Sequence, residues 1–214
     1  FLMDEPLSNL DAKLRNQMRA EIIKLRQRIN TTFVYVTHDQ TEAMTLGDRI
    51  IIMRDGYIQQ IGTPQEVFNH PKNLFVAGFI GSPQMNFFKN SLLLKKGDTY
   101  YVQVLDQLID LPEDKQNILR EKQAAETSVI VGVRPVHITL VDDGIDAKID
   151  VLEMMGSELH LHVTVQGQDV VIIVPTYNMR FDYQGSSNKA IKFSFQPKLM
   201  HIFDAETETN LFSE

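Results

Sequence analysis

Two adjacent carboxylates and a histidine are the side chains of this sequence best suited to chemistry. Asp4 and Glu5 follow an apolar run and stand directly before Pro6. An apolar run that stops at a proline is typical of a buried parallel strand that delivers its last residues to a crevice. Carboxylate oxygens suit a hard divalent cation. His38 follows a second run, residues 32–36, which is rich in β-branched and aromatic residues.

The elements that must position these side chains are a strand, a helix and a second strand. An apolar stripe between the two runs predicts a helix that packs on a sheet, and its members are Leu10, Leu14, Met18, Ile22, Leu25 and Ile29. Ser8 as N-cap and Asp11 three residues later form the pattern of a capping box. A right-handed crossover makes the strands parallel, so their carboxyl ends lie at one edge of the sheet. Glu5 and His38 are therefore expected to face the same crevice.

The same α/β pattern continues to residue 83. Asp39 with Glu42 repeats the capping pattern, and Asp55-Gly56 suits a two-residue hairpin turn. The predicted elements are a short helix from Asp39 to near Gly47, strands at residues 49–53 and 57–61, and helices from Thr63 and over residues 73–80.

Short extended runs separated by turn residues dominate the second half. They predict a small all-β barrel of the oligonucleotide/oligosaccharide-binding (OB) type with strands at residues 92–94, 99–105, 128–133, 145–152, 158–165, 169–174, 191–195 and 199–203, and a short helix at 114–122. Beyond residue 86 the chain carries twelve Lys and Arg against nineteen Asp and Glu, and this acidity argues against nucleic acid as a partner. His160 and His162 would share one face of a strand, but no third metal ligand stands in range.

Composition limits the chemistry further. The chain of 214 residues has no cysteine, which excludes disulfides and thiolate chemistry. No apolar run approaches the ~20 residues of a membrane span. A glycine-rich phosphate loop of the form G-x-x-x-x-G-K-[ST] does not occur in the sequence, and neither does an LSGGQ-like signature. A central strand needs neighbours on both sides, so we expect the sequence to be a fragment of a longer chain.

Several segments, in matching order and spacing, resemble the ATPases of ABC transporters. Phe-Leu-Met-Asp-Glu-Pro at residues 1–6 resembles the Walker B motif, Ser-Asn-Leu-Asp at 8–11 the D-loop, and Val-Thr-His-Asp at 36–39 the histidine switch. Residues 40–44, 53–64 and 75–83 are similar to the ATPase subunits of carbohydrate-uptake importers of the maltose and glycerol-phosphate type. Val-Gly-Val-Arg-Pro at 131–135 and His-Ile-Phe-Asp at 201–204 resemble their regulatory barrel, except that Val136 replaces the usual glutamate.

The resemblance implies an ATP and Mg²⁺ site. In this family the residue at the Asp4 position holds Mg²⁺, the one at Glu5 polarises the attacking water, and the one at His38 contacts the γ-phosphate. Ser8 and Asp11 would take part in nucleotide binding at the interface of an ATPase dimer, although capping alone also explains both. A lone histidine at a strand end is more often a structural residue than a catalyst, but its place beside Glu5 favours the phosphate role.

The expected protein is a partial P-loop NTPase fold of class α/β, residues 1–83, followed by an OB-like regulatory barrel, residues 84–214. The resemblance implies an ATPase dimer that drives a membrane permease from the cytoplasmic side, with a sugar as the transported solute. Without a phosphate loop, the 214-residue chain itself is expected neither to bind ATP tightly nor to hydrolyse it. The alternative is a regulatory module that dimerises or binds a signalling protein or small solute, and light scattering would distinguish the two.

Overall fold

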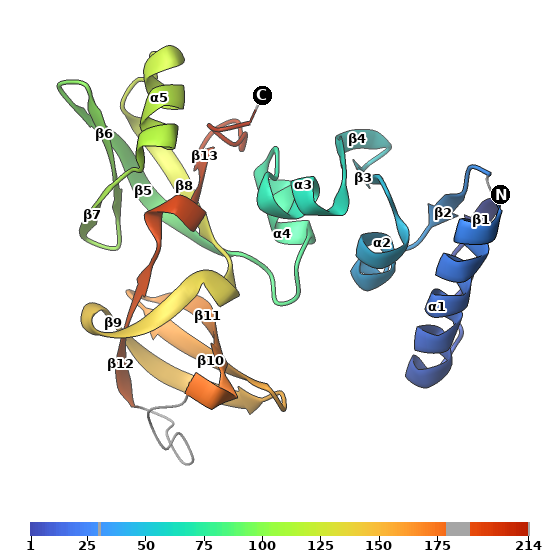
Figure 1. The fold of residues 1–214 in the computed structure, drawn as a ribbon. Coiled ribbons are helices and arrows are strands. Elements are labelled where there is room, and N and C mark those ends of the chain that lie inside the picture. Colours follow the sequence, from blue (N-terminus) through green and yellow to red (C-terminus); the bar gives the residue numbers. More distant parts are fainter. Residues whose placement is uncertain (30, 179–188, 214) are drawn as a thin grey trace. The chain divides into compact units, whose positions relative to one another are not determined.

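The computed structural model describes residues 1–29, 31–178 and 189–213. The chain divides into two compact units, Phe1–Lys72 (the first unit) and Asn73–Glu214 (the second unit) (Figure 1). In the part of the chain so described, we find no helix with the length and apolar character needed to cross a membrane.

The first unit is mixed α/β, as the sequence predicts. Its elements are β1 (Leu2–Asp4), α1 (Ala12–Arg28), β2 (Val34–Val36), α2 (Gln40–Leu46), β3 (Ile50–Arg54), β4 (Tyr57–Gly62) and α3 (Pro64–Asn69). β1 and β2 pair in parallel, with Asp4 opposite Val36, so the predicted parallel arrangement is confirmed. β3 and β4 form the predicted antiparallel hairpin, and its turn residues Asp55 and Gly56 both have positive φ.

The start of α1 differs from the prediction. Ser8 is not the N-cap; its hydroxyl donates to the carbonyl oxygen of Glu5 at 3.0 Å. Asp11 caps the helix instead, and one carboxylate oxygen accepts from the backbone N–H groups of Lys13 and Leu14, both at 3.0 Å. An ionised carboxylate that accepts two N–H groups is a stronger cap than a hydroxyl that accepts one. The helix therefore begins three residues later than predicted.

The burial predicted for β1 and α1 is also not found. Leu2 is 80% exposed, Val34 and Val36 are exposed beside it, and α1 has no buried residue. Leu14, which belongs to the apolar stripe, remains 41% exposed to solvent. Within the described residues, α1 instead contacts α2, so the apolar faces of β1, β2 and α1 are left largely uncovered.

The second unit is mainly β-structure. Its elements are α4 (Leu74–Phe79), β5 (Asn86–Lys96), β6 (Thr99–Val104), β7 (Gln107–Asp110), α5 (Glu113–Glu121), β8 (Thr127–Val133), β9 (Ile138–Met154), β10 (Glu158–Val165), β11 (Gln168–Pro175), β12 (Ala190–Phe195) and β13 (His201–Asp204), with 3-10 turns at Pro135–His137, Thr176–Asn178 and Pro197–Leu199. One sheet has the order β13-β8-β5-β6-β7 and the other β11-β10-β9-β12. Every strand pair in the two sheets is antiparallel.

One hydrophobic core joins the two sheets of the second unit. It includes Phe88 and Val131 from the five-stranded sheet and Leu161 and Phe193 from the four-stranded sheet. Asn86 on β5 makes two hydrogen bonds to β11. Its side-chain amide donates to the Val171 carbonyl and accepts from the Val171 N–H, each at 2.8 Å. The predicted OB-like architecture is thus built from two sheets around a shared core.

Candidate functional site

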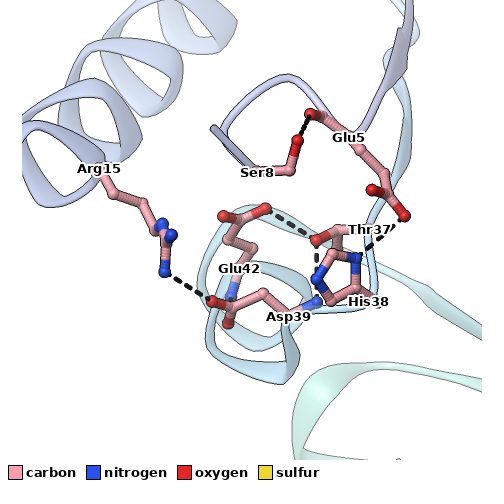
Figure 2. Close-up of a pocket in the computed structure, with 7 residues that line it drawn as sticks. All are labelled: Glu5, Ser8, Arg15, Thr37, His38, Asp39 and Glu42. Carbon is pink, nitrogen blue, oxygen red and sulfur yellow. Dashed lines mark hydrogen bonds and ion pairs between the residues drawn. The ribbon is translucent and has the colours of Figure 1, made fainter. Parts of the chain in front are cut away.

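A small pocket of the first unit lies where β1 and β2 end. It is lined by Glu5, Ser8, Arg15, Thr37, His38, Asp39 and Glu42 (Figure 2). The lining comes from four places: the turn after β1, α1, the loop between β2 and α2, and α2 itself, which carries Glu42. Three residues named from the sequence, Glu5, Ser8 and His38, therefore meet in one pocket.

Glu5 and His38 are in direct contact. The Glu5 carboxylate lies 2.9 Å from Nδ1 of His38 (Figure 2). The prediction that these two side chains face the same crevice is therefore confirmed. Glu5 has φ of +43°, in the left-handed region that side chains other than glycine rarely adopt. Its N–H still pairs with the Val36 carbonyl at 2.9 Å. The chain thus turns sharply at Glu5 immediately after its last sheet hydrogen bond.

The contact changes the protonation of His38. The hydrogen bond to Glu5, followed by the charge of Glu5, raises the His38 pKa above its ordinary value of 6.5. Because the folded pKa is the higher one, the contact adds stability at pH below 6.5 and loses it as pH rises through the raised pKa. The ring is 74% exposed, so this effect on stability is small. A carboxylate can only accept, so Nδ1 carries a proton in this contact.

Two arginines of α1 hold α2 at both ends. Arg15 lies 3.8 Å from the carboxylate of Asp39, which caps α2 by accepting from the N–H groups of residues 41 and 42 (Figure 2). Arg26 donates to the Leu46 carbonyl at the other end and pairs with Asp48 at 3.2 Å. A cation near helical carbonyls and an acid near helical N–H groups are both favourable.

Glu42 does not complete the capping box that the sequence indicates. Its carboxylate accepts from the hydroxyl groups of Tyr35, at 2.9 Å, and Thr37, at 2.8 Å. The side chain of Glu42 is buried, with 2% of the residue exposed. The Asp39 N–H donates to Thr37 at 3.0 Å. Burial, and next the hydrogen bond to Glu42, raise the Tyr35 pKa, so this phenol stays protonated as a donor.

Two residues named from the sequence, Asp4 and Asp11, do not line the pocket. Asp4 is exposed at the end of β1, and Asp11 caps α1. In the described ranges, no three His, Cys, Asp or Glu side chains are grouped to hold a metal ion. Mg²⁺ is commonly bound through one or two carboxylates together with phosphate oxygens and water. The exposed carboxylate of Asp4 fits such a role as a single ligand.

Sequence reasoning missed four residues of the pocket as functional candidates: Arg15, Thr37, Asp39 and Glu42. Asp39 and Glu42 were recognised only as a capping pattern. A polar residue on the inner side of a short helix, next to the apolar Leu46, is the signal that could have identified Glu42 as a buried acceptor. Arg15 lies off the apolar stripe of α1, where a solvated charge is the ordinary expectation.

Comparison with known proteins places these features in context. Residues 81–138 match the MalK OB fold domain, and residues 131–203 match the TOBE domain. The uncharacterized ABC transporter ATP-binding protein YcjV of Escherichia coli O6:K15:H31 (strain 536 / UPEC) is 48% identical over 97% of this chain and 56% of its own length. The oligosaccharides import ATP-binding protein MsmX of Bacillus subtilis (strain 168) is 47% identical over 99% of this chain and 57% of its own length.

A solved structure, the cytoplasmic molybdate-binding protein ModG, is similar over 55% of this chain and 94% of that chain, with 14% identity and a TM-score of 0.40. The chain spans about half the length of the curated relatives it matches. The two domain matches and these relatives show that the chain belongs to the family of ABC transporter ATP-binding proteins that carry a MalK-type OB-fold domain and a TOBE domain.

Proposed function

We propose that this chain is the carboxyl-terminal part of an ATPase that drives solute import through an ABC transporter, and that the solute is a sugar. The sugar assignment is supported by the relative MsmX, whose name describes oligosaccharide import. The proposed domains are residues 1–83, the end of the nucleotide-binding domain, and residues 84–214, a regulatory barrel. The proposed partners are a second ATPase subunit and a membrane permease, which would keep the protein at the cytoplasmic face of the membrane.

The observation that carries this proposal is the contact of Glu5 with His38 at the ends of two parallel strands. One Glu5 oxygen is engaged by Nδ1 of His38, and the other remains to polarise a water molecule. Because Glu5 raises the His38 pKa, both ring nitrogens carry protons over a wider pH range. Nε2–H can then donate to a phosphate oxygen while Nδ1–H donates to Glu5.

Asp4, Ser8 and Asp11 complete the proposed site. Asp4 would hold Mg²⁺, which supplies charge neutralisation for the transferred phosphoryl group when Mg-ATP is bound. Ser8 lines the pocket with Glu5, and Asp11 is the N-cap of α1. Both would take part in nucleotide binding near the subunit interface, in addition to the structural hydrogen bonds that each makes.

Replacing His38 with alanine in the full-length protein is expected to lower kcat for ATP hydrolysis by a factor of about 10² to 10³, the usual effect of losing one donor to developing charge. His70→Ala is the matched control, because His70 is an exposed histidine of the same unit at the end of α3. Steady-state phosphate release measures both variants. Unchanged hydrolysis by the His38→Ala protein would overturn the proposed function.

The 214-residue chain alone is expected not to bind Mg-ATP at micromolar concentration. In such ATPases, most of the contacts that bind phosphate come from the backbone N–H groups and the lysine of a phosphate loop. The sequence contains no phosphate-loop motif. Isothermal titration calorimetry compares this chain with the full-length protein. Micromolar binding by the chain itself would contradict the assignment of its nucleotide site as partial.

A further inference from the structure

Glu42 is a buried carboxylate whose partners lie outside its own helix. The residue is 2% exposed, and the same oxygen, Oε2, accepts from both the Tyr35 and Thr37 hydroxyl groups. Burying an ionised carboxylate is costly unless hydrogen bonds satisfy it. Here the two donors belong to β2 and to the residue that precedes His38. The carboxylate therefore ties α2 to the segment that carries His38.

Thr37 transmits this restraint across His38. Its hydroxyl donates to Glu42 at 2.8 Å and accepts from the Asp39 N–H at 3.0 Å (Figure 2). The residues on both sides of His38 are thereby fixed by one side chain. The His38 ring itself is largely exposed and has one side-chain contact described for it, the one with Glu5. Its direction depends on the backbone that Thr37 holds.

Helix capping does not account for Glu42. Asp39 accepts from the backbone N–H groups of residues 41 and 42, and the Asp39 N–H is taken by Thr37. The start of α2 is thus satisfied without the Glu42 carboxylate. A short helix of seven residues does not require a buried acid for its own stability, and glutamate at such a site is normally exposed.

We propose that Glu42 is a positioning residue for His38 and acts through Thr37. It holds residues 37–39 so that the imidazole stays opposite Glu5 with Nε2 directed outward for a phosphate oxygen. This inference rests on the proposed function, since the phosphate contact of His38 belongs to it. Glu42 itself touches neither nucleotide nor metal in this scheme.

Thr37→Val in the full-length protein tests the proposal, because valine keeps the branched shape and removes the hydroxyl that links Glu42 to the His38 segment. NMR titration of His38 is the first measurement. The hydrogen bond that His38 donates to Glu5 raises the His38 pKa, so loss of the restraint is expected to move the midpoint of titration down toward 6.5. The second measurement is kcat, which is expected to fall about tenfold to hundredfold with KM unchanged.

Two further variants make the test specific. Thr37→Ser keeps the hydroxyl and is expected to retain the raised midpoint and most of kcat. Thr45→Val is the matched control, since this exposed hydroxyl on α2 donates to the Thr41 carbonyl, at 2.6 Å, and not to the Glu42 side chain. Glu42→Gln retains an acceptor oxygen without the charge, so its His38 midpoint and its kcat are expected to lie between those of the wild type and Thr37→Val. Circular dichroism of all variants checks that each remains folded.

The outcomes separate this inference from the proposed function. If Thr37→Val and Glu42→Gln leave the His38 midpoint and kcat at wild-type values while His38→Ala lowers kcat as predicted above, the positioning role is overturned and the proposed function stands. If His38→Ala retains hydrolysis, the proposed function fails, and the titration of His38 in the Thr37→Val protein still decides whether Glu42 positions the ring. A lowered midpoint restored by Thr37→Ser supports the inference.

Discussion

Replacing Glu5 with glutamine in the full-length protein is expected to lower kcat for ATP hydrolysis by a factor of about 10² to 10⁴ and to leave Mg-ATP binding intact. Glutamine keeps the size of the side chain but cannot act as a base toward water. Asp4, which we assign to the metal, is unchanged by this substitution. Single-turnover hydrolysis measures the chemical step, and equilibrium binding of Mg-ATP measures retention of the nucleotide.

The Glu5→Gln protein is also expected to titrate differently. The hydrogen bond and the charge of Glu5 are the largest causes of the raised His38 pKa, so its midpoint should fall in this variant. Glu21→Gln is the matched control, because Glu21 is exposed on α1 and pairs with Lys24 at 2.7 Å, away from the pocket lining. A Glu5→Gln protein that hydrolyses ATP at the wild-type rate would contradict the assignment of Glu5.

The juxtaposition of Glu5 and His38 could be predicted because it needs only two strands and a crossover. Parallel pairing brings the residues after both strands to one edge, and this holds even though β1 is less buried than its apolar sequence indicates. The short caps and turns at Asp39, Thr63 and Asp55-Gly56 were equally accessible, since their partners lie within four residues in the sequence. Their functional roles remain predictions.

Two kinds of feature could not be predicted from the sequence. In one kind, two residues compete for the same role; in the other, a residue contacts partners that are distant in the sequence. Ser8 and Asp11 both suit an N-cap, and only the path of the chain after Glu5 decides that the Ser8 hydroxyl turns back to the Glu5 carbonyl. β9 begins at Ile138, well before the predicted residue 145, and runs through an Asp-Asp-Gly segment typical of a turn. Gly144 permits this because an added Cβ would lie 2.5 Å from the Phe193 carbonyl oxygen on β12.

Lys115 is the clearest case of a residue whose role depends on distant partners. It lies on α5, is 8% exposed, and its ammonium group donates to the carbonyl oxygens of Pro197, at 2.9 Å, Lys198, at 3.1 Å, and Met200. The Nζ atom also lies 5.2 Å from the centre of the Phe212 ring. One cation thus holds a turn more than eighty residues away in the sequence.

Lys115→Met is expected to lower the free energy of unfolding by about 2–3 kcal/mol, as measured by urea denaturation. Two effects oppose each other. Burial disfavours the charge and lowers the Lys115 pKa to about 8, and replacing a buried ion by an apolar side chain can relieve such a cost. Met200 is 1% exposed, and its carbonyl would lose its donor. The cost of this unsatisfied acceptor is expected to outweigh the relief of burial, so the substitution is expected to destabilise the protein.

The pH dependence separates the two effects. The folded pKa of Lys115, about 8, lies below its ordinary value of 10.5, so the unfolded chain binds more protons between these values. Wild-type protein therefore gains stability from this group as pH rises from about 8 to about 10.5, and the methionine variant lacks that gain. The stability difference between the two proteins should widen across this window.

Lys122→Met is the control that isolates burial from hydrogen bonding. The Lys122 ammonium group also donates to two backbone carbonyls, those of Leu211 at 3.0 Å and Ser213 at 2.9 Å, but these bonds are exposed. Water can replace the lost donor there, so a loss below about 1 kcal/mol is expected. Equal losses for the two variants would show that the turn at residues 197–200 recovers its hydrogen bonds from water, and that the buried position of Lys115 does not matter.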